Sequence, residues 1–245
     1  KNCKLIHMKR IVIVGATSGI GREVACLFAQ QGWVVGAAGR REKELKELQL
    51  LYPQQIHTEV IDITTEEATT SLSRLIESCG GMDVYFHASG IGKQNYSLNS
   101  AIELATIKTN AEGFVRMITA AWDYFRQKGQ GHIAVISSIA GTKGLGAAPA
   151  YSATKRFQNC YLEALAQLAR LNHLTDIRPG FVATDLLADG KKYPLLMQKE
   201  KVARLIVQAI LKRKKRVILD WKYVILVFFW RLIPASIWEW LPIRN

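Results

Sequence analysis

Apolar runs of strand length alternate with stretches of helical periodicity from residue 11 onward. The runs are short and nearly continuous, as expected for strands buried on both faces of a sheet. Such alternation predicts a parallel sheet covered by helices on both sides. In the first half we expect strands at residues 11–14, 34–38, 56–61 and 84–86, and helices at residues 20–31, 42–51 and 66–78.

The second half continues the alternation without a linker. We expect a long helix at residues 101–127, a strand at 133–137, a helix at 150–170, a short strand at 176–178, a helix at 202–211 and a strand at 217–219. With 245 residues, 49% of them apolar, the chain can build one large core. The prediction is a single α/β domain over residues 1–220, a Rossmann-type doubly wound parallel sheet of about seven strands. An apolar and aromatic tail follows at residues 221–245, either as part of the same domain or as a membrane or subunit contact.

A glycine-rich segment, Gly15-Ala16-Thr17-Ser18-Gly19-Ile20-Gly21, joins the first strand to the first helix. Glycine lets the backbone approach a pyrophosphate closely, and the helix N-terminus offers free N–H groups to the anion. We call residues 15–21 the phosphate loop and expect cofactor contacts from Gly15, Thr17, Ser18, Gly19, Ile20 and Gly21.

A serine, a tyrosine and a lysine follow the strand at residues 133–137. Ser138 is next in sequence, and Tyr151 and Lys155 are four residues apart, on one face of the expected helix. Tyrosine has an ordinary pKa of about 10, so it works as an acid or base near neutral pH when a cation favours its phenolate. Lys155 provides that cation, and Ser137 is the alternative to Ser138.

These motifs, in this order, resemble the classical short-chain dehydrogenase/reductase family over residues 10–220. Two further segments match the family pattern, Thr109-Asn110-Ala111-Glu112-Gly113 and Arg178-Pro179-Gly180-Phe181-Val182-Ala183-Thr184. The resemblance implies an NAD(P)-dependent oxidoreductase in which Ser138 polarises the substrate carbonyl and Tyr151 donates the proton. It also implies that Lys155 holds the nicotinamide ribose, that Asn110 holds a water of a proton relay, and that the cofactor contacts include Tyr151, Lys155, Pro179, Gly180, Val182 and Thr184.

The end of the second strand favours NADP(H) over NAD(H). NAD-binding proteins carry an acidic side chain there, whereas this chain has Gly39-Arg40-Arg41. Arginine suits a 2′-phosphate, although both arginines could instead begin a solvated helix, Arg41 more readily than Arg40. Asp62, with Ile63 beside it, resembles the adenine-contacting position of the family, and the alternative for Asp62 is a turn cap.

One segment departs from the family pattern. Where the family has Asn-Asn-Ala-Gly after the fourth strand, this chain has His87-Ala88-Ser89-Gly90. We still expect Ala88, Ser89 and Gly90 beside the cofactor. We expect His87 to be structural, and we expect no metal site, because no second ligand lies at a recognisable spacing.

The segment at residues 184–200 is the substrate lid of the family. Its apolar residues are Leu186, Leu187, Tyr193, Leu195, Leu196 and Met197. They indicate either that the substrate is a lipophilic ketone or that this segment packs against the body of the domain. The predicted reaction is reduction of a ketone to a secondary alcohol with NADPH. The alternatives are a catalytically silent NADPH-binding sensor or scaffold, and the keto-reducing half of a two-component membrane epimerase.

The tail and the net charge of +13 bear on partners. The uninterrupted apolar run in the tail is shorter than the roughly 20 residues that are needed to span a bilayer. Its tryptophans with basic neighbours suit a helix lying on a membrane surface, a subunit interface, or a cover over the active-site mouth. The sequence contains no nucleic-acid-recognition motif besides its positive charge, so we expect no nucleic-acid partner. The unpaired cysteines and the absence of a signal-peptide pattern fit a cytoplasmic protein, peripheral on a membrane at most, and the resemblance implies a homodimer or homotetramer.

Overall fold

The computed structural model describes residues 9–169, 172–184 and 193–241. Its main sheet is parallel throughout, in the order β3-β2-β1-β4-β5-β6-β9. The strands are β1 (Arg10–Val14), β2 (Val34–Gly39), β3 (Ile56–Val60), β4 (Val84–His87), β5 (Gly131–Ile136), β6 (Asn172–Arg178) and β9 (Arg216–Ile218). The doubly wound α/β sheet of about seven strands is therefore confirmed.

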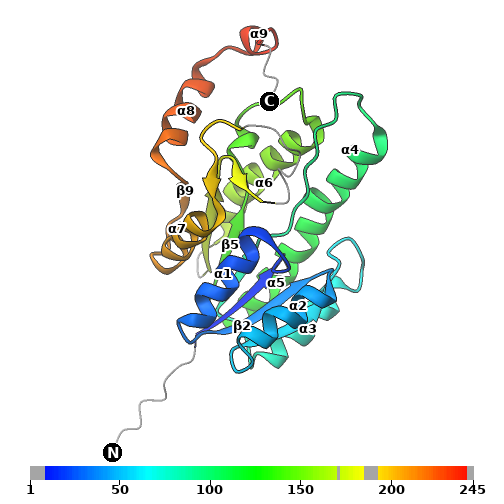
Figure 1. Ribbon diagram of the computed structural model, residues 1–245, viewed down its shortest axis with the longest axis vertical. Helices are drawn as coiled ribbons and strands as arrows, with labels where there is room; N and C mark the ends of the chain where they lie inside the picture. The colour runs from blue at the N-terminus through cyan, green and yellow to red at the C-terminus, as the bar shows by residue number, and fades with distance from the viewer. Residues whose placement is uncertain (1–8, 170–171, 185–192, 242–245) are drawn as a thin grey trace, which may run out of the picture.

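Helices cover both faces of this sheet (Figure 1). Alternate residues of β1 enter different cores: Ile11 and Ile13 face one side, whereas Val12 and Val14 face the other. The first core contains side chains of α1 (Gly19–Gln30), α2 (Glu42–Leu51) and α7 (Lys199–Leu211). The second contains side chains of α3 (Ala68–Ser78), α5 (Phe114–Lys128) and α6 (Pro149–Leu168).

The direction of winding changes between β1 and β4, which lie side by side in the sheet. From β1 the chain proceeds outward to β2 and β3, and then returns to β4 and continues in the other direction. In such sheets ligands bind at the carboxyl ends of the strands next to this switch. The pairing of Val14 with His87 brings the phosphate loop against residues 88–90.

The predicted long helix at residues 101–127 was wrong in its middle. Helix α4 (Ser100–Ile107) passes into a π-helical segment, η1 (Lys108–Gly113), before α5 begins. Residue 113 must be small, because a Cβ on Gly113 would lie 2.9 Å from the carbonyl oxygen of Ile63. Asn110 lies inside the π segment, a type of irregularity that is frequent at functional sites.

Other elements also differ from the expectation. Strand β6 begins at Asn172 rather than near residue 176. A small second sheet joins β7 (Val182–Ala183) to β8 (Met197–Gln198), and a 3₁₀ turn, η2 (Ile139–Thr142), follows Ser138.

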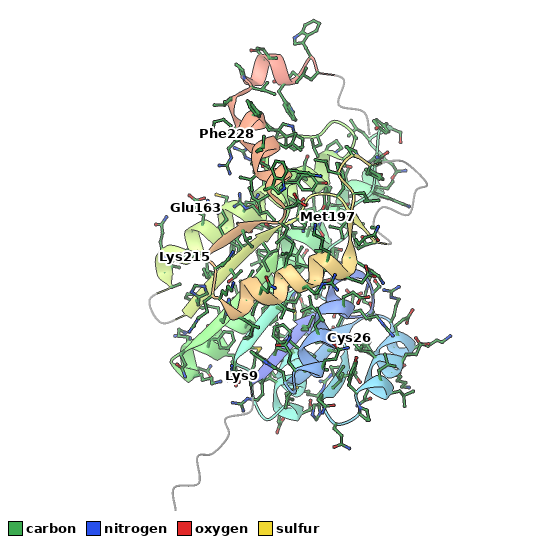
Figure 2. All side chains as sticks on the ribbon, turned by 60° about the vertical axis from the view of Figure 1, so that its left-hand side comes forward. Lys9, Cys26, Glu163, Met197, Lys215 and Phe228 are labelled. Carbon is green, nitrogen blue, oxygen red and sulfur yellow. The ribbon has the colours of Figure 1, made fainter. Side chains whose placement is uncertain are left out.

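The tail forms α8 (Trp221–Leu232) and α9 (Ala235–Trp238), which project from one end of the molecule (Figure 1). Asp220 begins α8 by accepting a hydrogen bond from the backbone N–H of Lys222. One face of α8 joins the first core through Tyr223 and Val227. The other face is exposed, and Figure 2 shows Phe228 on this projecting helix.

Candidate active site

The phosphate loop is a tight turn that only glycine can form at its first position. Gly15 has a φ of +99°, and its N–H donates to the carbonyl of Ala38 at 2.8 Å. A Cβ on Gly15 would lie 2.6 Å from the backbone nitrogen of Ser89. The loop therefore packs directly on the segment after β4. Gly19 then lies beside Thr184, which brings the predicted nicotinamide segment to the loop.

The N-terminus of α1 faces this loop. Ser18 is its N-cap, and among the described residues its side chain makes no capping hydrogen bond. The orphan N–H groups of the first turn and the Ser18 hydroxyl are thus left for a ligand. Ile20 is half-buried against the first core.

The two arginines after β2 differ in their contacts. The guanidinium of Arg41 donates to Thr17 Oγ1 at 3.0 Å, and Gly39 leaves room for the methyl group of Thr17. Arg40 is exposed and makes no hydrogen bond or ion pair within the part of the chain that the structure describes. Arg40 therefore has its donors available, whereas Arg41 is partly committed.

Asp62 caps the turn that follows β3. Its Oδ1 accepts from the backbone N–H of Thr64 at 2.9 Å and from its hydroxyl at 2.8 Å. Burial raises the pKa of Asp62, but these hydrogen bonds and the charge of Arg40 outweigh it and keep the pKa below its ordinary value. The adenine contact of Asp62 stays a prediction. Ile63 is buried in the second core, against Gly113.

The four predicted catalytic residues meet at the carboxyl ends of β4 and β5. Tyr151 and Lys155 lie on α6, with the lysine Nζ 5.8 Å from the centre of the tyrosine ring. Ser138 is buried after β5, where its hydroxyl oxygen accepts from the N–H of Ala140 and lies beside the phenol of Tyr151. Gly90 packs between Asn110 and Lys155. The geometry gives a hydroxyl, a phenol and an ammonium next to the phosphate loop.

Burial controls the protonation of the tyrosine and the lysine. Burial raises the pKa of Tyr151, and the hydrogen bond with Ser138 opposes it. Burial also lowers the pKa of Lys155 to about 8, while the Asp176 carboxylate acts in the opposite direction. Both shifts favour the neutral forms, as desolvation does.

Asn110 holds the loop after β4. Its Oδ1 accepts from the N–H of Ile91 at 2.9 Å, and its Nδ2 donates to the carbonyl of Ile91 at 2.6 Å and to Thr154 Oγ1 at 3.3 Å. Its backbone carbonyl accepts from Gln158 Nε2 at 2.8 Å. The side chain of Asn110 is thus occupied by structural hydrogen bonds, and its relay water stays a prediction.

Sequence reasoning missed a buried polar group behind the lysine. The Ser137 hydroxyl donates to Asp176 Oδ1, and the guanidinium of Arg178 forms an ion pair with Asp176 at 2.6 Å. These contacts commit Ser137 to the interior, which favours Ser138 as the substrate-facing serine. The alternating positions 176 and 178 share one face of β6, which is the only sequence signal for this pair.

The segment after β6 is fixed by the tail. Tyr223 accepts a hydrogen bond from the N–H of Phe181 at 3.0 Å and donates to the carbonyl of Leu195 at 3.0 Å. Gly180 has no Cβ where the ring of Tyr223 lies, so its lack of a side chain serves packing. Pro179 accepts from the N–H of Ile139. One tail residue therefore joins the two sides of the predicted lid.

The lid residues divide in their environment. Leu186 and Leu187 lie outside the described residues. Met197 is buried in the first core, and Tyr193 packs on Phe181 with ring centres 4.9 Å apart. Leu195 and Leu196 are partly exposed. Val182 is buried, and Thr184 is half-buried beside Gly19.

His87 is a buried residue of β4. The Tyr85 hydroxyl lies 3.0 Å from its Nδ1, and its ring meets Phe114 edge-on. Burial, aided by the charge of Lys155, lowers the pKa of His87 to about 3, so the imidazole is neutral at physiological pH. Among the described residues no cluster of histidine, cysteine and carboxylate side chains could hold a metal ion. Ala88 donates its N–H to Val14 beside the phosphate loop.

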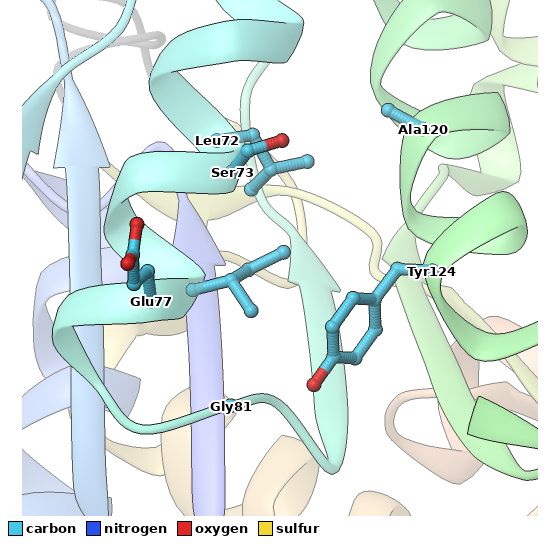
Figure 3. Close-up of a pocket in the computed structure, with 7 residues that line it drawn as sticks. Leu72, Ser73, Glu77, Gly81, Ala120 and Tyr124 are labelled. Carbon is cyan, nitrogen blue, oxygen red and sulfur yellow. The ribbon is translucent and has the colours of Figure 1, made fainter. Parts of the chain in front are cut away.

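A separate pocket of about 340 Å³ lies between α3 and α5 (Figure 3). Leu72, Ile76 and Tyr124 contribute to its lining, and Gly81 precedes β4. The pocket is therefore at the amino ends of the strands, opposite the predicted catalytic residues. Ligands of open α/β sheets bind at the carboxyl ends, so this pocket is not the candidate site.

Comparison with known proteins points in one direction. Residues 9–193 match the family model described as short chain dehydrogenase. An uncharacterized oxidoreductase of Mycobacterium tuberculosis is 30% identical over 250 residues, covering 97% of this chain and 92% of that protein. An uncharacterized oxidoreductase of Myxococcus xanthus is 28% identical over 240 residues, covering 93% and 94%.

Solved structures share the fold. A short-chain dehydrogenase from Streptomyces avermitilis superposes with a TM-score of 0.81 at 23% identity, covering 95% of this chain and 96% of that one. An alcohol dehydrogenase from Thermococcus sibiricus complexed with 5-hydroxy-NADP gives 0.76 at 22%, covering 86% and 96%. A short-chain dehydrogenase/reductase from Burkholderia phymatum in complex with NAD gives 0.80 at 18%, covering 90% and 92%.

Proposed function

The chain belongs to the short-chain dehydrogenase/reductase family of NAD(P)-dependent oxidoreductases, and from this premise we propose that it uses NADPH to reduce a lipophilic ketone to a secondary alcohol. The observation that carries the proposal is the meeting of Ser138, Tyr151 and Lys155 beside the phosphate loop. A phenol, a hydroxyl and an ammonium at the switch point of a doubly wound sheet fit carbonyl reduction.

The residues present fit a dinucleotide. The absence of Cβ atoms at Gly15 and Gly21 lets the phosphate loop pack tightly on itself and on Ala88 and Ser89. The N-terminus of α1 behind this loop offers its N–H groups to a pyrophosphate. Ala88 and Ser89 pack against the loop, and Gly90 lies next to Asn110 and Lys155. We assign Val182 and Thr184 to the nicotinamide end. When bound, the nicotinamide supplies the hydride.

The chain's own residues handle the substrate oxygen. The Ser138 hydroxyl donates a hydrogen bond to the carbonyl oxygen and stabilises the negative charge that develops there. The phenol of Tyr151 gives its proton to the same oxygen. Lys155, as the ammonium, lowers the cost of the phenolate that remains, against the burial that raises the pKa of Tyr151.

Cofactor preference provides one test. The solved relatives bind either NADP or NAD, so the proposed preference for NADPH depends on Arg40. Because a hydrogen bond to a charged group is worth about 1.5–3 kcal/mol, we expect Arg40→Ala to weaken NADPH binding about 10- to 100-fold and to leave NADH binding nearly unchanged. Fluorescence titration with both cofactors measures this. The matched control is Lys46→Ala, which removes a charge of α2 that is paired with Glu42. An unchanged ratio of affinities in Arg40→Ala would remove Arg40 from the specificity determinants.

Turnover separates the proposed reductase from the alternatives. A sensor or scaffold would bind NADPH but would not oxidise it when mixed with any ketone of a panel of aliphatic and aromatic ketones. The reducing half of a two-component epimerase would consume NADPH only with a keto intermediate made by a partner oxidoreductase. The reductase consumes NADPH with simple lipophilic ketones, which Leu195 and Leu196 at the lid favour.

Two exposed apolar surfaces have different proposed occupants. Leu104 and Ile107 on α4 and Phe157 on α6 are exposed, and we assign this surface to a second copy of the chain. On α8, one face completes the domain through Tyr223 and Val227, as part of the same core. The opposite face is exposed and consists of Trp221, Val224, Ile225, Phe228, Phe229 and Leu232.

We assign the exposed face of α8 to an anionic membrane surface. Lys222 and Arg231 are exposed near its ends, where they can meet lipid headgroups, and the protein carries a net charge of +13. No helix among the described residues has the length and apolar character to span a bilayer. Contact would therefore be peripheral for this face.

Flotation tests the membrane contact. We expect the protein to float with phosphatidylglycerol vesicles, and the double variant Phe228→Ser, Phe229→Ser to lose at least about 100-fold in affinity, because each buried phenylalanine contributes about 1.5–3 kcal/mol. Leu104→Ser, on the proposed subunit surface, is the control that keeps flotation. Equal flotation of the double variant, or its conversion to a monomer in sedimentation velocity, would mean that α8 does not bind membranes.

A further inference from the structure

Gln158 connects two members of the proposed catalytic set. It lies three residues after Lys155 on α6, and its side chain is fully buried. Its Oε1 accepts a hydrogen bond from Lys155 Nζ at 3.0 Å, and its Nε2 donates to the backbone carbonyl of Asn110 at 2.8 Å. The two partners determine the orientation of the amide, because an ammonium can only donate and a carbonyl can only accept.

This bridge limits the freedom of the lysine. An ammonium has three N–H donors. Lys155 uses one on Gln158 and another on the carbonyl of Ile136 at 3.2 Å. The third is left for the cofactor ribose or for Tyr151. The ammonium is therefore held between α6 and the end of β5 before any ligand binds.

The bridge also occupies the direction in which a relay water is expected. The family resemblance assigns to Asn110 a water that passes protons toward the lysine. In this chain the amide of Gln158 extends from Lys155 to the Asn110 carbonyl instead. In its ordinary form an amide oxygen only accepts and an amide nitrogen only donates, so the amide does not pass a proton along.

We propose that Gln158 is a positioning residue that fixes the Lys155 ammonium to the backbone of Asn110 and takes the place of a relay water between them. The proposal rests on the proposed function, in which Lys155 holds the cofactor and assists Tyr151. The amide oxygen of Gln158 stabilises the charged Lys155, and the amide nitrogen of Gln158 fixes the π-helical segment that carries Asn110. No proton moves along this link.

Several other groups act on the charge of Lys155 and must be kept constant in a test. Tyr151 lies on the same helix, 5.8 Å from the ammonium. The negative charge of Asp176 on β6 raises the pKa of Lys155, and the positive charge of Lys155 lowers the pKa of His87 on β4. Gln158 is the uncharged neighbour that can be exchanged at nearly constant volume.

Two variants of matched size test the positioning role. Gln158→Met removes the acceptor, and Gln158→Glu replaces it with an anion. Since an acceptor and an opposite charge both favour the ammonium, we expect the alkaline limit of activity to move about one pH unit lower in Gln158→Met and one to two units higher in Gln158→Glu. The same opposite shifts are expected in the pH dependence of NADPH affinity, measured by fluorescence titration.

Binding and turnover keep the two proposals separable. If the wild type binds NADPH but reduces no ketone, the proposed reaction fails, and the binding profiles still test Gln158. Equal binding at pH 6, where Lys155 is protonated in all forms, shows that the variants fold. Identical pH profiles in Gln158→Met, Gln158→Glu and the wild type would overturn the positioning role.

A third variant tests the place of the water. Gln158→Ala opens a gap next to Lys155 Nζ and the Asn110 carbonyl, where a water has polar partners. We expect the pH profile of Gln158→Ala to lie closer to that of the wild type than the profile of Gln158→Met does. A residue that only filled space would give the reverse order, because methionine fills the volume and alanine does not.

Discussion

Replacing Tyr151 by phenylalanine is expected to lower kcat about 1,000-fold while NADPH affinity changes less than about threefold, because a positioned general acid contributes about 10²–10⁴ to the rate. The substitution removes only the hydroxyl that lies beside Ser138 and leaves the ring that packs on Gly92. The loss should therefore appear in kcat and not in stability. Steady-state kinetics with a ketone that the wild type reduces measure the change in kcat, and the midpoint of thermal unfolding measures the change in stability.

Tyr161 on the same helix provides the control. Its ring packs on Phe114 and Phe157, and it lies outside the group formed by Ser138 and Lys155. Tyr161→Phe should keep the wild-type kcat. If Tyr151→Phe is as active as Tyr161→Phe, another group protonates the substrate and the proposed mechanism is wrong.

Gly15→Ala is expected to have the largest effect on cofactor binding. The new methyl group would lie 2.6 Å from the backbone nitrogen of Ser89, and φ is +99°, a conformation that alanine rarely adopts. Because backbone strain of this kind costs about 1–3 kcal/mol before the clash is relieved, we expect at least a 100-fold loss of NADPH affinity or an equivalent loss of stability. Fluorescence titration and urea unfolding separate the two.

Gly146→Ala is the matched control for that substitution. Gly146 is exposed, and an added Cβ would meet nothing within 4 Å. It should bind NADPH as the wild type does. Wild-type affinity and stability in Gly15→Ala would show that the loop does not need glycine there and would weaken its assignment to the pyrophosphate.

The centre of the sheet was predictable because strands such as β1 and β2 are apolar on both faces. Residues 11–14 alternate between two cores, and no polar side chain interrupts them. Strand β6 was predicted too short because His173 and Thr175 look like loop residues. They are accommodated by long-range partners: His132 lies 2.8 Å from the Thr175 hydroxyl, and its ring meets that of His173. The hydrophobic periodicity of a single segment cannot predict such contacts between distant residues.

The helix around Asn110 shows a similar limit. Helical periodicity runs through residues 101–127, yet the backbone widens to a π-helix at Lys108–Gly113. This segment contacts residues from elsewhere in the chain: Gly113 closely approaches Ile63, and Asn110 hydrogen-bonds Ile91. Local sequence cannot report these contacts.

The proposed catalytic residues could be predicted from sequence because their spacing and order are specific, whereas the residues that support them could not. Gln158 and Asp176 have no motif of their own, and each has a partner outside its own element, the Asn110 carbonyl for Gln158 and the Ser137 hydroxyl for Asp176. Tyr223 belongs to the C-terminal tail, and it hydrogen-bonds residues 181 and 195. Each acts through geometry that only folding brings together.

Transfer of a labelled hydride tests the central claim most directly. NADPH carrying deuterium at the reactive carbon of the nicotinamide is mixed with the protein and a panel of lipophilic ketones, and the products are analysed by mass spectrometry. We predict a secondary alcohol that carries one deuterium on the former carbonyl carbon, formed by the wild type and strongly reduced in Tyr151→Phe. Tight NADPH binding with no deuterium transferred to any ketone would contradict the account and favour a cofactor-binding sensor.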